Sequence, residues 1–199
     1  VKIEVKTASS TINKNEATNH FNLPQDKIIL LFVADKLNNK RKGFSTLLEA
    51  LADITIDKKD VILCSIGKTI KKALNMDFEH IELGYIADER EMNFAYAAAD
   101  CFVIPSLQDN LPNTLVESLL SGTPVIGFPV GGIPEMIEQG KNGILCEDSN
   151  VESLSKAIIQ FINNDFDFSS NEIAEKAAEK YNIYKQVKKY LNLYENILK

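Results

Sequence analysis

Four basic side chains crowd into one short segment of a chain that is acidic overall. Lys36, Lys40, Arg41 and Lys42 lie within seven positions, and Gly43 follows them directly. Basic side chains beside the N-terminus of a helix are a typical way to hold a phosphate group. The segment therefore predicts a local anion site, and a solvated surface turn is the alternative. The net charge of −6 argues against a general nucleic-acid or anionic-membrane surface.

A pair of carboxylates eight positions apart, Asp109 and Glu117, is the second group that could do chemistry. Between them, Asn110 can cap a helix and Pro112 suits its first turn. This places Asp109 in the loop before the helix and Glu117 on the helix. A carboxylate accepts hydrogen bonds from adjacent hydroxyls, such as those of a sugar. Helix capping and surface charge are the alternative roles.

Glycines follow several of the apolar runs, where the chain leaves a predicted strand. They are Gly67, Gly84, Gly131 and Gly132. A glycine at such a turn lets the backbone approach a ligand closely. The phosphate-binding pattern G-x-x-x-x-G-K-[ST] does not occur, so the anion site is not a Walker A loop.

The elements that must position these residues alternate between two patterns. Short runs rich in Val and Ile, typical of strands buried on both faces, are separated by helical patterns. The runs are 28–34, 61–66, 80–83, 101–104, 124–128 and 143–146. Helical patterns cover 43–52, 88–99, the segment that follows Pro112, and 149–163, 170–181 and 184–198. This order predicts an α/β fold: a Rossmann-like, doubly wound parallel sheet of about six strands with flanking helices and a helical C-terminal tail. Ligands of such sheets lie at the carboxyl ends of the strands.

The cysteines and histidines indicate neither a metal site nor a disulfide framework. Cys64, Cys101 and Cys146 each stand inside an apolar run and are expected to be buried thiols. His20 and His80 have no neighbouring metal-ligand motif, so no metal is predicted. Reduced thiols fit a cytoplasmic setting. The longest apolar runs are too short for a transmembrane helix.

The order and spacing of these motifs resemble the C-terminal, donor-binding half of the retaining GT-B glycosyltransferases of family four, glycosyl transferases group 1. The resemblance runs from about Asp26 to the C-terminus. The family's E-x7-E motif reads Asp109-x7-Glu117, followed by the strand S-G-T-P-V-I, and its R-x5-K-G motif reads Lys36-x5-Lys42-Gly43. Segments 22–32, 84–86 and 98–106 are similar to further blocks of the family's pattern. Two residues depart from it, because Lys36 stands for Arg and Asp109 for Glu.

This resemblance implies a role for each matching residue. Lys36 and Lys42 bind the diphosphate and stabilise the leaving group, and Asp109 contacts the donor sugar, so these three are the expected catalytic residues. Glu117 accepts the ribose hydroxyls, and the backbone of Ile86 meets the nucleobase. Backbone N–H groups at 110–114 face the distal phosphate and the sugar. The expected donor site therefore comprises Lys36, Lys42, Gly67, Ile86, Asp109, Asn110, Leu111, Asn113, Thr114 and Glu117.

The resemblance also implies a reaction and a domain arrangement. A UDP- or GDP-sugar donates its glycosyl group with retention and without a metal ion, to a saccharide or lipid-linked acceptor, in surface polysaccharide or glycoconjugate synthesis. Residues 23–199 form the nucleotide-sugar-binding domain, and 1–22, of which the first 20 are polar and poor in core pattern, are a remnant of the linker from an N-terminal acceptor domain. The helix at 184–198 packs partly onto that domain. The protein acts in the cytoplasm or at the inner face of the membrane. Nucleic acid is not an expected partner.

Two alternatives remain open. A sugar-nucleotide epimerase of the same two-domain architecture would use a similar donor site. A receiver-type signalling domain would need paired acids after its first strand, where this chain has Asp35 beside a cation cluster.

Overall fold

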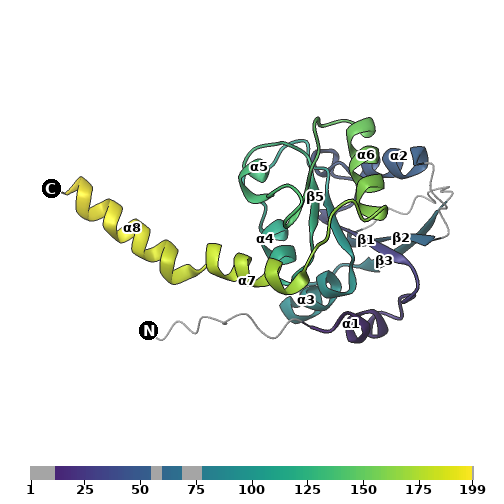
Figure 1. Ribbon diagram of the computed structural model, residues 1–199, viewed down its shortest axis with the longest axis horizontal. Helices are drawn as coiled ribbons and strands as arrows, with labels where there is room; N and C mark the ends of the chain where they lie inside the picture. The colour runs from purple at the N-terminus through teal and green to yellow at the C-terminus, as the bar shows by residue number, and fades with distance from the viewer. Residues whose placement is uncertain (1–11, 55–59, 69–77, 199) are drawn as a thin grey trace.

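A parallel sheet of six strands forms the centre of the molecule (Figure 1). The computed structural model describes residues 12–54, 60–68 and 78–198. The strands are β1 (Ile28–Lys36), β2 (Val61–Lys68), β3 (Glu79–Gly84), β4 (Cys101–Ile104), β5 (Val125–Gly127) and β6 (Gly143–Leu145). Their order is β3-β2-β1-β4-β5-β6, with every neighbouring pair parallel. The predicted Rossmann-like fold is thereby confirmed, and this order differs from the 2-1-3-4-5 order of receiver domains.

Helices cover both faces of the sheet. They are α1 (Lys14–His20), α2 (Phe44–Asp53), α3 (Glu89–Ala98), α4 (Asn113–Leu120), α5 (Ile133–Met136), α6 (Val151–Ile162), α7 (Ser170–Lys180) and α8 (Ile183–Ile197), with a short 3₁₀ helix, η1, at Lys40–Lys42. Apolar side chains of α2 and α6 pack on one face, and those of α1, α3, α4 and α7 on the other. Along β1, Ile29 and Leu31 face one of these layers, and Leu30 and Phe32 face the other. This two-sided burial explains why the strands are continuous apolar runs.

The helix α1 lies in a segment that the sequence predicted to be linker. Ala17 and Thr18 are buried in it, and Ala17 joins the core beside α3. The His20 ring stacks on Phe94 with 4.7 Å between ring centroids. The expectation that residues up to 20 lack a core pattern is therefore wrong for 14–20, because one small apolar residue in a polar helix suffices for docking. Whether 1–22 come from an interdomain linker stays a prediction, and 1–11 lie outside the described residues.

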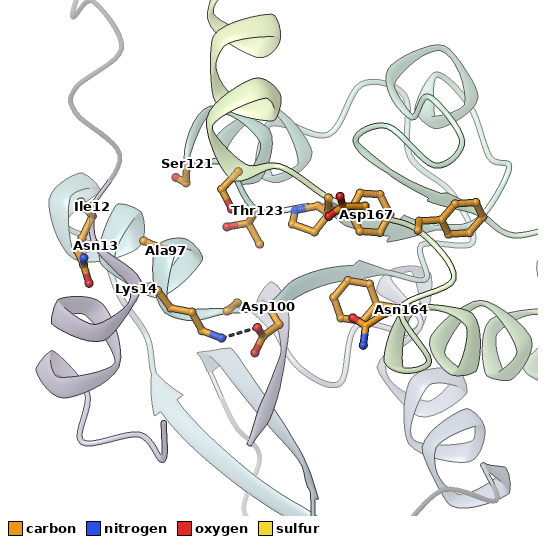
Figure 2. Close-up of a pocket in the computed structure, with 15 residues that line it drawn as sticks. Ile12, Asn13, Lys14, Ala97, Asp100, Ser121, Thr123, Asn164 and Asp167 are labelled. Carbon is orange, nitrogen blue, oxygen red and sulfur yellow. Dashed lines mark hydrogen bonds and ion pairs between the residues drawn. The ribbon is translucent and has the colours of Figure 1, made fainter. Parts of the chain in front are cut away.

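A cavity of about 740 Å³ opens beside the start of α1 (Figure 2). Lys14 reaches across one side of it to pair with Asp100, which also accepts a hydrogen bond from the backbone N–H of Ile29 at 2.9 Å. Asp100 directly precedes β4, and Pro124, another lining residue, directly precedes β5. The cavity therefore lies at the amino edge of the sheet.

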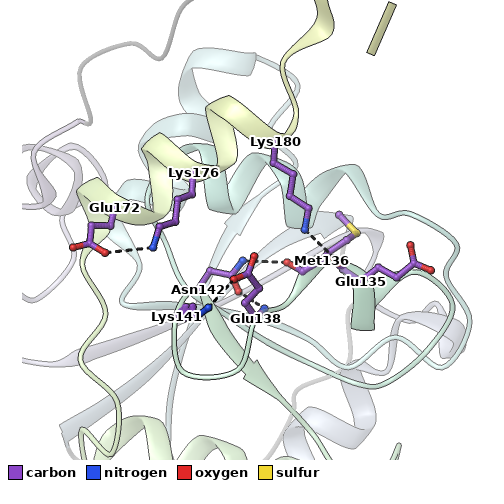
Figure 3. Close-up of polar contacts among 8 residues, drawn as sticks. All are labelled: Glu135, Met136, Glu138, Lys141, Asn142, Glu172, Lys176 and Lys180. Atoms are coloured by element: carbon purple, nitrogen blue, oxygen red, sulfur yellow. Dashed lines mark hydrogen bonds and ion pairs between the residues drawn. The ribbon is translucent and has the colours of Figure 1, made fainter. Parts of the chain in front are cut away.

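Polar contacts join α7 to α5 and close the turn between α5 and β6 (Figure 3). Lys180 Nζ donates to the backbone carbonyl of Glu135 at 2.8 Å. Asn142 Nδ2 donates to the carbonyl of Met136 at 3.0 Å, and its Oδ1 accepts from the N–H of Glu138 at 2.7 Å. The bond of Lys180, the last residue of α7, therefore holds the end of that helix against α5.

Beyond that point, α8 extends away from the rest of the domain (Figure 1). Its large apolar side chains are exposed: Ile183, Tyr184, Val187, Tyr190, Leu191, Leu193, Tyr194 and Ile197. No helix in the described part of the chain is both long and apolar enough to cross a membrane.

The three cysteines are free and buried, which confirms the prediction made for them. Burial raises the pKa of Cys64 and of Cys146 to about 12. Such thiols stay protonated at neutral pH and fill space in the core.

Candidate functional site

Three loops meet at the carboxyl edge of the sheet, opposite the cavity. They follow β1, β4 and β5, and the loop after β4 lies between the other two. The N–H of Leu107 donates to the carbonyl of Arg41 at 2.8 Å, and the N–H of Gly132 donates to the carbonyl of Asn110 at 2.6 Å. These backbone bonds hold the basic segment and the segment of Asp109 in fixed positions.

Glycines make this close packing of loops possible. Gly43 has φ +74°, and a Cβ added there would lie 1.9 Å from the carbonyl oxygen of Pro105. Gly131 has φ +56°, and a Cβ there would lie 1.7 Å from the carbonyl oxygen of Asp109. The sequence predicted that glycines after the strands admit a ligand. At Gly131 the neighbour is instead the backbone of the site loop, which the glycine helps to place.

An ion pair joins two of the predicted site residues. Lys42 Nζ lies 2.7 Å from Asp109 Oδ2, and the buried Ser106 hydroxyl lies 3.4 Å from the same oxygen. The side chains of Lys42 and Asp109 are 27% and 16% exposed. Both groups are thus held at the surface of the edge, where each can still meet a ligand.

The other cations of the segment lie nearby on exposed backbone. Lys36 ends β1 and stands in register with Lys68 at the end of β2. The Asn39 side chain accepts from the N–H of Arg41 at 3.2 Å and so caps η1, which carries Lys42. Among the described residues, an ion pair joins Lys42 to Asp109, and no hydrogen bond or ion pair joins Lys36 to either of them.

The start of α4 differs from the prediction. The helix begins at Asn113 with Pro112 in the N-cap position, and no side chain caps it. Asn110 does not cap the helix as expected, because its carbonyl is bound to Gly132 and its segment forms the site loop. The N–H groups of a first helical turn lack intrahelical partners, so those of Asn113 and Thr114 suit a negative ligand.

Glu117 lies one turn into α4 with its side chain toward α3. Its Oε2 accepts a hydrogen bond from the hydroxyl of Tyr96 at 3.1 Å. Tyr96 is fully buried, and burial together with the Glu117 charge raises the pKa of its phenol well above the usual value. Tyr96 was not among the predicted site residues, so this partner of Glu117 was missed. A lone tyrosine among the alanines of α3 was the available signal.

The ends of β2 and β3 complete the edge. Gly67 packs against the carbonyl of Ala34, which a Cβ would approach to 2.2 Å. The Lys68 ammonium lies 4.7 Å from the centre of the exposed Tyr85 ring, a cation–π contact. The next residue, Ile86, is half-buried against the core. Both predicted positions, Gly67 and Ile86, therefore lie at this edge.

The cavity at the amino edge is a different place. None of the predicted site residues lines it. Two of its hydroxyls are already bonded within the protein: Thr123 Oγ1 donates to the carbonyl of Tyr96 at 2.7 Å, and Ser121 Oγ to that of Glu117 at 3.0 Å. Among the described residues, no group of three His, Cys, Asp or Glu side chains could hold a metal ion.

Comparison with known proteins points to one family. The family model for glycosyl transferases group 1 matches residues 13–187. An uncharacterised glycosyltransferase of Haemophilus influenzae is 27% identical over 132 residues, which cover 62% of this chain and 36% of that protein. Sucrose-phosphate synthase from Thermosynechococcus elongatus superposes with a TM-score of 0.76 at 22% identity, over 96% of this chain and 52% of that chain. The Anabaena HepE protein in complex with UDP gives a TM-score of 0.75 at 19% identity, over 92% and 53%. The chain thus spans between a third and about half of the length of these proteins.

Proposed function

This chain belongs to the glycosyl transferases group 1 family, and we propose that the carboxyl edge of its sheet binds the nucleoside diphosphate sugar donor of a glycosyl transfer. The observation that carries the proposal is the ion pair of Lys42 with Asp109 at 2.7 Å. It places a phosphate-binding cation beside a hydroxyl-binding carboxylate, and these two groups complement the phosphates and hydroxyls that a sugar diphosphate presents to a protein.

In the proposed reaction these residues act on the leaving group. Cleavage of the bond between the anomeric carbon and the distal phosphate leaves negative charge on the nucleoside diphosphate. In this proposal Lys42, Lys36 and the N–H groups at the start of α4 face the oxygen on which that charge grows, and preorganised groups of this kind stabilise the transition state. The charges of the protein serve this role without a metal ion. Asp109 binds the donor sugar, and transfer proceeds with retention.

The remaining contacts hold the nucleoside. Glu117 accepts the ribose hydroxyls, and the backbone of Ile86 and the turn at Gly67 meet the base. Asn110, Leu111 and the first residues of α4, Asn113 and Thr114, surround the distal phosphate and the sugar. The UDP bound to the Anabaena protein of similar fold supports a nucleoside diphosphate as ligand. We propose a UDP- or GDP-sugar as the donor.

We propose a preceding acceptor-binding domain, because the chain spans about half of the superposed structures. The exposed apolar side chains of α8 would pack on this acceptor-binding domain, since a large contiguous apolar surface is rarely left in water. The acceptor is a saccharide or lipid-linked molecule of surface polysaccharide or glycoconjugate synthesis, in the cytoplasm or at the inner face of the membrane.

Ligand-dependent stability tests the proposal. The melting temperature is measured with UDP, GDP, ADP and their sugars, and the binder is then titrated by calorimetry. A ligand at 100 times its dissociation constant adds about 2.7 kcal/mol of stability. A rise with one nucleotide, lost in Lys42→Ala, supports the donor site, and no rise with any of them refutes it. Product analysis of the protein with an acceptor domain separates transfer from epimerisation.

A further inference from the structure

Tyr96 is the largest of the fully buried side chains in the described part of the chain. Its ring packs in the core against Phe102, with 5.6 Å between ring centroids and planes at 86°. Its hydroxyl donates to Glu117 Oε2 at 3.1 Å. A core tyrosine is thus directed at the carboxylate of an exposed residue.

Two hydrogen bonds also fix the backbone carbonyl of Tyr96. Its carbonyl accepts from Thr123 Oγ1 at 2.7 Å and from the N–H of Ala99 at 3.1 Å. Thr123 precedes β5, so these bonds join the end of α3 to the sheet. The hydroxyl of Tyr96 therefore has a fixed position relative to α4.

A fixed donor determines where the Glu117 carboxylate lies. A free glutamate on a helix surface samples several rotamers, and ordering such a side chain costs free energy on binding. A carboxylate has about four acceptor positions, and one hydrogen bond from Tyr96 uses one of them. Within the described part of the chain, no other side chain binds this carboxylate, so Oε1 stays available to accept from neighbouring hydroxyls.

We propose that Tyr96 is a positioning residue for donor recognition, which holds the Glu117 carboxylate in the orientation that accepts the two ribose hydroxyls. This inference rests on the proposed function and deepens it. The phenol touches no ligand and acts through Glu117 alone. Its buried state keeps it protonated, so it serves as a donor throughout the physiological pH range.

The test compares ribonucleotides with 2′-deoxyribonucleotides. Dissociation constants are measured for whichever of UDP, GDP and ADP binds, and for its 2′-deoxy form, in the wild-type chain, Tyr96→Phe, Glu117→Gln and the double variant. Tyr96→Phe keeps the ring in the core and removes only the hydroxyl. The matched control is Ser118→Ala, which removes a buried hydroxyl that donates to the carbonyl of Thr123 at 2.9 Å, next to Glu117 but not bound to its carboxylate.

The expected result is a loss of sugar discrimination. Hydrogen bonds to a charged group correspond to roughly 10-fold or more in affinity, so the wild type should favour the ribonucleotide by about that factor. Tyr96→Phe should lower the preference about 3-fold or more, Glu117→Gln should lower it further, and the double variant should match Glu117→Gln. Ser118→Ala should keep the wild-type preference.

Two other results would contradict different parts of the proposal. If Glu117→Gln removes the preference but Tyr96→Phe keeps it, the positioning role is wrong and the donor site stands. If the wild type binds no nucleotide, the proposed function itself fails. Should Tyr96→Phe not fold, fluorine NMR of the wild-type chain labelled with 3-fluorotyrosine decides. One buried tyrosine resonance that shifts both in Glu117→Gln and on nucleotide binding supports the role, and its constancy overturns it.

Discussion

Substitution of each partner of the ion pair between Lys42 and Asp109 should affect diphosphate binding in opposite directions. Removing the cation in Lys42→Ala deletes a charge-assisted contact to a phosphate, worth about 1.5–3 kcal/mol. We therefore expect nucleoside diphosphate affinity to fall about 10- to 100-fold. The parent nucleoside, which has no phosphate, should change less than about 2-fold.

Asp109→Asn should act differently. It removes the negative charge 2.7 Å from Lys42 Nζ, so the ammonium is left without its partner and more available to a phosphate. Binding of the nucleoside diphosphate alone should stay equal or tighten. The additional affinity that the donor sugar contributes should decrease, because the carboxylate no longer accepts its hydroxyls.

Calorimetry with nucleoside, nucleoside diphosphate and nucleotide sugar gives three dissociation constants, from which the contributions of the nucleoside, the diphosphate and the sugar to affinity are obtained. Lys40→Ala is the matched control, because Lys40 is an exposed cation of the same short helix. The pair is partly exposed, so its loss should cost only about 1 kcal/mol of folding stability, and both variants should remain folded. Equal losses of nucleoside and diphosphate affinity in Lys42→Ala would refute the phosphate role, and so would weaker diphosphate binding in Asp109→Asn.

Three further predictions concern the fold around the site. Gly131→Ala should destabilise the chain by more than about 2 kcal/mol in urea unfolding, because its Cβ would lie 1.7 Å from a backbone oxygen at a positive φ; an unchanged midpoint would contradict the loop packing. Burial lowers the pKa of His80, so the unfolded chain binds more protons. Stability should therefore decrease as the pH falls from about 7 to 5, and His80→Asn should flatten that part of the profile; an equal slope in both proteins would contradict it. Leu191→Lys on α8 should leave the melting temperature of this chain within about 1 °C, because the side chain is 55% exposed, and a larger decrease would show that α8 packs on the domain.

Much of the fold could be predicted from the sequence because the pattern is strong where both faces of a strand are buried. Each of the six apolar runs became a strand, with ends within two residues of those expected. The helix at 14–20 was missed because Ala17 and Thr18 are its only buried residues, too few to form a period. The cap at Asn110 was wrong because local preference was overruled by a backbone bond to Gly132 in the next loop.

By itself, the sequence determined the kinds of groups at the carboxyl edge of the sheet. Cations follow β1 and carboxylates follow β4, and parallel strands bring such segments to one edge. Only the tertiary structure decided which of them meet. Lys42 contacts Asp109 across 67 positions of chain, and Tyr96 contacts Glu117 across 21. These contacts depend on how the helices pack and on loops whose close approach requires glycine. Residue type and spacing along the chain therefore do not predict which side chains meet.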